Sequence, residues 1–286
     1  MRIRQISAHF GDFRLLPDLP FEYALEATRI HSVAGTLGRQ ALLRRPPLRA
    51  PHHTTSDAGM TGGGRPLRPG EVSLAHRGVL FLDELAEFRR PVLEALRQPL
   101  EEGVVRLVRA HGALELPARF QLVAATNPCP CGYRGDPRRE CDCDDGQVRR
   151  YRAKLSGPLL DRIDLGVAVT PVPWSGTGTL PVRGESTHEV RARVSRARRI
   201  QLERYRETPS RTNADLPGPL LGRHFMVSEG ARSLLQRSAA RLGLSMRAHD
   251  RVLRVARTAA DLDAAPRVAP DHLAEALSLR LDEPGR

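Results

Sequence analysis

The chain has 286 residues, of which 40% are hydrophobic and 27% charged, and this fits a globular protein with one large or two modest domains. Its formal net charge of +12 permits nucleic-acid binding, but Lys154 is its only lysine, and a high-GC coding bias would produce the same excess of arginine. An aromatic content of 4% argues against a base-stacking surface, and without an apolar run of about 18 residues or a signal-peptide core we expect a cytoplasmic protein with no membrane span.

The first half of the chain predicts helices and strands that alternate. Gly35 is a plausible C-cap for a first helix, and a long stretch rich in Pro, Gly and Thr follows it. Apolar runs and helical spacing resume beyond that stretch. The expected elements are a helix over 20–35, loops over 44–78, a strand over 79–83, a helix over 88–103 and a β-hairpin over 104–116.

The second half predicts a change from mixed structure to helices. A second apolar strand over 119–128 precedes the cysteines, and residues 153–169 predict a short helix and a third strand. After a Pro- and Gly-rich linker, Ser186 with Glu189 forms a capping box, and Ser228 can cap a further helix. The chain therefore predicts an α/β core followed by a helical domain.

Two adjacent acids end the first apolar strand. Asp83 and Glu84 directly follow Val79 to Leu82, a run typical of a buried parallel strand. Carboxylates at the carboxyl edge of a parallel sheet suit Mg²⁺ binding and the orientation of an attacking water in a nucleotide hydrolase. The alternative is a strand that ends in solvated acids.

Two further polar residues stand where such a site needs them. Asn127 ends the second strand, where its side chain would reach a γ-phosphate or the attacking water. Arg162 lies just before the expected third strand, where a guanidinium would reach the nucleotide of a neighbouring subunit. The alternative for Arg162 is a surface ion pair with Asp161 or Asp164.

All four cysteines fall in one short segment as two Cys-x-Cys pairs, Cys129 with Cys131 and Cys141 with Cys143. A disulfide framework would spread its cysteines along the chain, so the cluster indicates a metal site in a reducing compartment. Four thiolates suit a structural, tetrahedral Zn²⁺ and leave no open position for catalysis. The alternative is four free thiols on a loop.

Other polar segments have less specific patterns. His52 and His53 are adjacent on a Pro-rich loop, and we expect no metal there because no nearby acid pair completes a site. Arg106 and Arg109 on the hairpin are candidate DNA contacts, with an ordinary solvated hairpin as the alternative. Residues 190–206 carry seven arginines scattered around a helix, which favours a solvated helix over one lying on DNA.

Longer motifs show a resemblance to a known family. The segments "PHHTTSD", "RPGEVSLAHRGVLFLDELAEF", "AATNPCPCGY" and "RRYRAKLSGPLLDRIDL" resemble the Mg-chelatase-like AAA+ ATPases of the ComM (YifB) type. The likeness runs from about residue 15 to about residue 280. It implies an α/β fold, with a truncated, P-loop NTPase-like AAA+ parallel-sheet core followed by an all-helical lid domain.

The resemblance also implies roles for individual residues. Asp83 and Glu84 become the Walker B pair, with Asp83 on Mg²⁺, and Asn127 becomes sensor 1. Arg162 becomes the arginine finger, and Arg247, which opens a lid helix, the sensor 2 arginine. Family members bind ATP with Mg²⁺ and form hexameric rings. The ComM type is linked to ATP-driven branch migration of DNA in natural transformation, and other relatives insert magnesium into porphyrin.

The sequence departs from the family in its phosphate-binding loop. No Gly-Lys followed by Ser or Thr occurs, and Lys154 stands in a different motif. We expect a carboxyl-terminal part of such an ATPase, inactive alone, with a homo- or hetero-oligomeric ring as its context. Its expected parts are a non-native or disordered start (1–14), an incomplete AAA+ core (15–170), a linker (171–185) and the lid (186–286).

Two alternatives to this ATPase role follow. The first is a non-enzymatic remnant that joins a ring or binds DNA. The second is a subunit of the magnesium-chelatase type.

Overall fold

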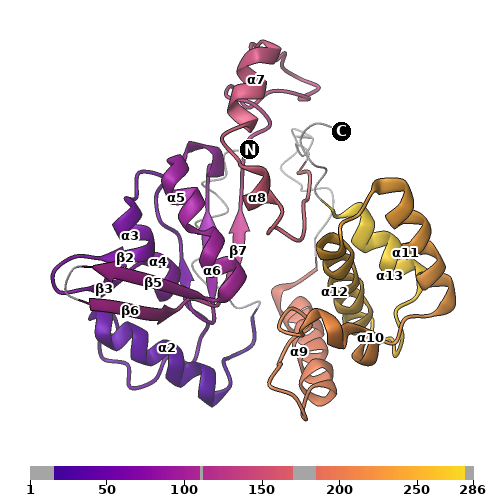
Figure 1. The fold of residues 1–286 in the computed structure, drawn as a ribbon, viewed down its shortest axis with the longest axis horizontal. Helices are drawn as coiled ribbons and strands as arrows, with labels where there is room; N and C mark the ends of the chain where they lie inside the picture. The colour runs from indigo at the N-terminus through magenta and orange to yellow at the C-terminus, as the bar shows by residue number, and fades with distance from the viewer. Residues whose placement is uncertain (1–15, 110–111, 170–184, 281–286) are drawn as a thin grey trace.

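A three-stranded parallel sheet organises the amino-terminal part of the molecule (Figure 1). The computed structural model describes residues 16–109, 112–169 and 185–280. The strand order is β1 (Leu48–Arg49), β4 (Val79–Leu82) and β7 (Gln121–Ala124). Every residue of the central strand β4 is buried, as its apolar composition requires. The strands expected within 79–83 and 119–128 are therefore confirmed as neighbours in one sheet.

The start of β4 depends on a glycine. The backbone N–H of Val79 donates to the carbonyl of Pro47 over 2.8 Å, which brings the segment before β1 against β4. A Cβ on Gly78 would lie 1.9 Å from that same carbonyl oxygen. Only a residue without a side chain fits this approach.

Short helices and two antiparallel ribbons surround the sheet. The expected helix over 88–103 is broken at Leu96 into two, and the expected loop region before β4 contains several short elements. The hairpin is confirmed, although the residues at its tip lie outside the described part. These elements are α2 (Phe21–Ala34), α3 (Asp57–Thr61), β2 (Gly62–Gly63), β3 (Arg68–Pro69), α4 (Glu71–Leu74), η1 (Leu85–Glu87), α5 (Arg90–Ala95), α6 (Arg97–Glu102), β5 (Val104–Arg109) and β6 (Gly112–Pro117).

The predicted third strand is wrong. Beyond α8 (Gly157–Leu160), the described residues up to 169 form no strand, and Leu165, Val167 and Val169 are 47%, 72% and 87% exposed. A strand exists only when a neighbour pairs with it. Among the described residues β7 is the last strand on its side of the sheet, so the apolar alternation has no partner there.

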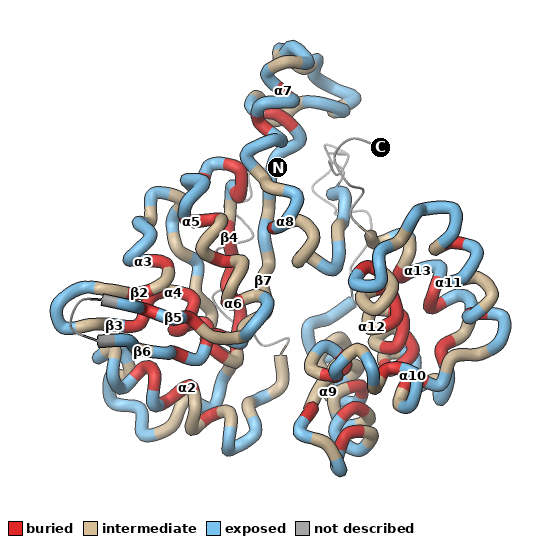
Figure 2. The backbone as a smooth tube through the Cα atoms, in the orientation of Figure 1, coloured by how far each residue is buried: buried red, intermediate tan, exposed pale blue. Residues whose placement is uncertain are grey.

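Helix α7 (Asp145–Arg152) has no counterpart among the predicted elements, which leave residues 129–152 without a helix or strand. Asp144 caps it, accepting from the Gln147 N–H over 2.8 Å, while the Gln147 side chain accepts from the Asp144 N–H over 3.0 Å. Only Val148 and Tyr151 of this helix are buried. Figure 1 shows α7 beyond the carboxyl end of β7, and Figure 2 shows it largely exposed.

The carboxyl-terminal part is helical, as predicted. Its core contains Tyr205, Leu216, Leu235, Val252 and Leu273, and it is distinct from the core around β4. The two predicted N-caps are confirmed, since the hydroxyl groups of both serines accept from helix N–H groups. The helices are α9 (Thr187–Arg204), η2 (Gly218–Leu220), α10 (Leu221–His224), α11 (Glu229–Leu242), α12 (Met246–Leu262) and α13 (Pro270–Ser278).

The predicted domain limits stay predictions. The expected start over 1–14 and nearly all of the expected linker over 171–185 lie outside the described residues. Within the described part, no helix has both the length and the apolar character needed to cross a bilayer.

Candidate functional site

The carboxyl end of β4 places two acids on a strained turn. Glu84 has φ +52° and ψ +49°, a left-handed conformation that is unfavourable for a residue with a side chain. Its backbone N–H donates to Asp83 Oδ1 over 2.9 Å, and the N–H of Leu85 donates to the carbonyl of Ala125 over 2.8 Å. The first bond closes the turn on itself, and the second holds it against the end of β7. Strain of this kind is concentrated at functional sites.

Asn127 lies at the same edge as the two acids. Leu82 pairs with Ala124, and the Ala125 N–H donates to the Leu82 carbonyl over 2.9 Å, so β4 and β7 end level. Asp83 and Asn127 each follow one of these strand ends within three residues, and Asn127 is exposed. The sequence-predicted convergence of acids and amide at one sheet edge is therefore present.

His53 is the residue at this edge that sequence reasoning missed. Its Nδ1 lies 3.2 Å from Glu84 Oε2, and its ring meets Phe88 edge-on with 6.4 Å between centroids. In the sequence His53 has no nearby acid pair, so its pattern predicts no site. The acid that it meets follows the neighbouring strand, and the "PHHT" motif was the available signal.

The two predicted arginines meet at one carboxylate, Glu101 of α6. Arg162 forms an ion pair with Glu101 and also donates from Nη1 to the Pro158 carbonyl over 2.6 Å. Arg247 Nη2 donates to Glu101 Oε1 over 2.9 Å. Hydrogen bonding from Arg162, reinforced by Arg247, holds the pKa of Glu101 below its usual value. In this structure both guanidinium groups are thus engaged within their own chain.

The expected alternative for Arg162, an ion pair with Asp161 or Asp164, is wrong. Asp161 instead accepts from Arg251 Nη2 over 2.5 Å and lies 3.8 Å from Arg247 Nη1. These contacts join the lid helix α12 to the core. Among the described residues, neither predicted arginine contacts the acids of β4 or Asn127.

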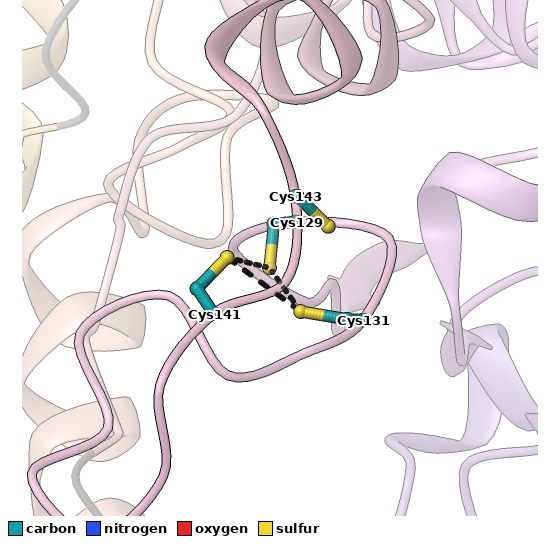
Figure 3. Close-up of side chains that lie close together, drawn as sticks. All are labelled: Cys129, Cys131, Cys141 and Cys143. Carbon is teal, nitrogen blue, oxygen red and sulfur yellow. Dashed lines mark hydrogen bonds between the residues drawn. The ribbon is translucent and has the colours of Figure 1, made fainter.

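The four cysteine sulfurs gather as predicted (Figure 3). They all lie within 4.8 Å of one another, and no disulfide joins them. The Sγ of Cys129 is 3.4 Å from that of Cys131 and 3.6 Å from that of Cys141, and 3.6 Å separates the last two. Cys129 is fully buried while the others are half-buried. Such an arrangement of thiols can hold a metal ion.

Two adjoining clefts run between α7 and the segment after the acids, and cations dominate their walls. Glu87, Arg150 and Lys154 line both. Lys154 Nζ lies 3.2 Å from Glu87 Oε2, and Arg89 pairs with Asp57 over 3.5 Å, so among the cationic lining residues Arg90 and Arg150 have no ion pair among the described residues. The cationic side chains are those of Arg89, Arg90, Arg150 and Lys154. Their charge suits a phosphate group.

Arg106, one of the two arginines expected to contact DNA, has its charge satisfied within the chain. Arg106 pairs with Glu102 and, over 2.9 Å, with Glu115. The side chain of Arg109 lies outside the described residues. In α9, Arg193 pairs with Glu185, and Arg204 is bonded to buried Asp261. The charges of Arg106 on the hairpin and of Arg193 and Arg204 on α9 are therefore neutralised within the chain.

The molecule has a parallel-sheet core followed by a helical region, and the family matches assign this fold to the AAA+ class. The chain belongs to the magnesium chelatase family. Residues 12–176 match the family described as magnesium chelatase, subunit ChlI, and residues 184–280 match its C-terminal domain.

The relatives include proteins of the type that the motifs indicated. The chain is 51% identical over 270 residues to an uncharacterised protein of Mycobacterium tuberculosis, covering 93% of this chain and 52% of that protein. Over 267 residues it is 44% identical to the uncharacterised protein YifB of Escherichia coli and 42% identical to the competence protein ComM of Haemophilus influenzae. Both matches cover 93% of this chain and 51% of the relative. The chain spans about half the length of these relatives.

Proposed function

We propose that the chain supplies part of an ATP-binding and ATP-hydrolysing ring subunit of the ComM type. The convergence of Asp83, Glu84 and Asn127 at one sheet edge supports this most directly. Asp83 would hold Mg²⁺, Glu84 would orient and activate the attacking water, and Asn127 would position it. His53, in contact with Glu84, would hold that carboxylate in place.

A phosphate-binding loop is the part that the 286 residues do not contain. Mg²⁺ bridges phosphate oxygens that backbone N–H groups and a lysine normally cradle. We propose that a polypeptide of these residues alone does not hydrolyse ATP. Turnover by the purified chain that Glu84→Gln abolishes would refute this.

We propose that Arg162 acts in a ring of subunits, by family resemblance a hexamer, where it reaches the nucleotide of a neighbouring subunit. Its guanidinium would stabilise the transition state at a neighbour's nucleotide, after exchanging Glu101 for phosphate oxygens. Arg247 would sense the γ-phosphate from the lid helix. The shared carboxylate of Glu101 would keep both arginines in place until then.

A mixed ring tests this role of Arg162. The chain, added to full-length YifB, is expected to co-elute with it. Arg162→Ala should then depress turnover at the adjacent sites by about 10³-fold, the usual effect of losing an arginine finger. The comparison is ATPase activity with increasing amounts of wild-type chain, Arg162→Ala, or Arg241→Ala as an exposed control on α11. Absence of co-elution with unchanged ATPase activity would contradict the mixed ring.

DNA remodelling, including branch migration, is the proposed work of such a ring. The cleft lined by Arg90, Arg150 and Lys154, between α7 and the segment after the acids, supports a DNA contact better than Arg106 does, because its cations outnumber its acids. Phosphate contacts of this kind release counterions and make binding depend on salt.

Reversing charge in this cleft should weaken DNA binding. The double substitution Arg90→Glu with Arg150→Glu is expected to lower affinity for single-stranded DNA about tenfold or more at low salt and to flatten the salt dependence. Fluorescence anisotropy across a salt series measures both quantities. Arg232→Glu with Arg241→Glu on α11 makes the same charge change elsewhere. Equal loss in both doubles would mean that net charge alone sets binding.

A non-enzymatic ring-interaction or DNA-binding role is the second candidate. The engagement of Arg162 within its own chain favours it, because that contact needs no nucleotide. A magnesium-chelatase-type role remains a third reading from the family alone.

The cofactors that we propose are ATP and Mg²⁺ at the sheet edge and a structural Zn²⁺ at the four cysteines. Soft thiolate ligands favour Zn²⁺ over the hard cations Mg²⁺ and Ca²⁺.

A further inference from the structure

We infer that a Zn²⁺ held by the four cysteines fastens the loop after β7 to helix α7, and so fixes the position of Asn127. The inference rests on the proposed zinc ion but does not require ATP turnover. It assigns the metal a positioning role at the sheet edge rather than a catalytic one.

The geometry of the sulfurs fits one tetrahedral ion. A Zn–S bond of about 2.3 Å implies sulfurs about 3.8 Å apart at the corners of a tetrahedron. Three of the sulfurs are separated by 3.4 to 3.6 Å, and the fourth, that of Cys143, lies within the overall 4.8 Å limit. Figure 3 shows the four side chains converging from two stretches of one loop. Small adjustments complete the coordination shell.

The first Cys-x-Cys pair lies against Asn127. The chain reverses after Cys131 at Gly132, which has φ +84° and donates its N–H to the Cys129 carbonyl over 3.1 Å. A Cβ on Gly132 would lie 3.9 Å from Asn127 Cγ. The turn that presents two thiolates therefore also packs beside the amide of Asn127.

The second pair leads directly into α7. Cys143 precedes Asp144, the N-cap of the helix. Arg134, from between the two pairs, donates from both Nη1 and Nη2 to Asp145 over 3.1 Å. An isolated helix of eight residues is marginal in water, and α7 buries few side chains, so it needs an external anchor.

The end of α7 returns to the sheet edge. Tyr151 is buried and lies near the side chain of Thr126, the residue before Asn127. Two residues beyond the helix, Lys154 contacts Glu87. The segment 127–154 thus leaves the sheet edge at Asn127 and returns to it after α7. One ion at the cysteines would bind the two ends of the loop within this segment to each other. Without the ion, the Thr126 contact and the weak Arg134 pair would have to hold α7 alone.

Metal binding is tested first. The full chain, produced in zinc-supplemented medium and then purified, should contain one zinc ion per chain by mass spectrometry. Cobalt titration of the metal-free chain should give the visible absorption of a tetrahedral tetrathiolate site, complete at one equivalent. Cys141→Ser should weaken or change that spectrum, whereas Arg138→Ala in the same loop should leave it unchanged. Absence of both bound zinc and the cobalt spectrum would overturn the inference.

The positioning role is tested by hydrogen exchange. Removing the metal from the wild-type chain should speed exchange at 127–152 at least about tenfold, as expected when an anchored segment opens locally. Amides of α11 and α13 should not change and serve as internal controls. Re-addition of Zn²⁺ should restore protection. Bound zinc with unchanged exchange at 127–152 would leave a metal site but overturn its positioning role.

Discussion

Replacing Asp261 with alanine is expected to remove about 3–5 kcal/mol from the unfolding free energy of the helical domain, since it leaves the buried guanidinium of Arg257 and the half-buried one of Arg204 without their counter-charge. Asp261 is fully buried, and it accepts from Arg204 Nη1 over 2.9 Å and from Arg257 Nε over 3.1 Å. Asn213 Nδ2 donates to it over 2.9 Å. Burial alone would raise the pKa of Asp261, but hydrogen bonds from Arg204 and Asn213 hold it below its usual value.

Hydrogen exchange in α11 and α13 as a function of urea measures this loss within the full chain. Asp263→Ala is the matched control, because Asp263 is 66% exposed and its pairing with His272 over 3.2 Å should contribute less than about 1 kcal/mol. Equal losses in the two variants would contradict the buried-network account.

The hydrogen-bond network of Asp261 should also affect how α12 contacts the core. Asp261 stands near the end of α12, and Arg247 and Arg251 near the start of that helix contact the core. Loosening α12 should therefore also release Arg247 from Glu101. Weaker protection at α6 in Asp261→Ala than in Asp263→Ala would accompany this release.

The sheet edge was predictable because its signals are local. Each of the two confirmed strands is a short apolar run, and the polar residue after it is fixed by chain order. The register of parallel neighbours then brings Asp83 and Asn127 to one edge without further information. The clustering of the cysteines was equally local, since all of them lie in one loop.

The remaining features depend on partners distant in the chain. The contact of His53 with Glu84 joins the segments that follow two different strands, and that of Arg162 with Glu101 joins the segment after α8 to α6. The segment up to residue 169 has a strand-like sequence but no strand to pair with among the described residues. Pattern reasoning cannot supply such partners, because periodicity reports burial and not pairing.

Acidification should destabilise the core through His76, which is buried where three segments meet. Its Nε2 donates to Glu26 Oε2 over 3.0 Å, and its Nδ1 accepts from the backbone N–H of Arg119 over 3.0 Å. Both ring nitrogens are thereby committed to the neutral form. Burial lowers the pKa of His76 to about 4, against the opposing pull of Glu26.

Acidification destabilises the folded core, because the pKa of His76 is lower in the folded protein than in the unfolded chain. The unfolded ring has a pKa near 6.5, so the contribution of His76 is complete above that pH and is lost as the pH falls toward 4. The full loss is about 3 kcal/mol, of which about 2 kcal/mol falls between pH 7 and pH 5. Glu26 adds little in this window, because its pKa is lowered from 4.5 in the folded protein and its carboxyl is still mainly ionised at pH 5 in the unfolded chain.

Urea unfolding of the wild type and of His76→Gln, at pH 7 and pH 5, isolates this contribution. Glutamine retains a donor for Glu26 but does not titrate, so the variant should start less stable at pH 7 and lose less on acidification. Burial also lowers the pKa of His31, but that ring is present in both proteins and its contribution cancels. A variant that loses as much stability as the wild type between these pH values would show that other groups set the acid sensitivity of the core.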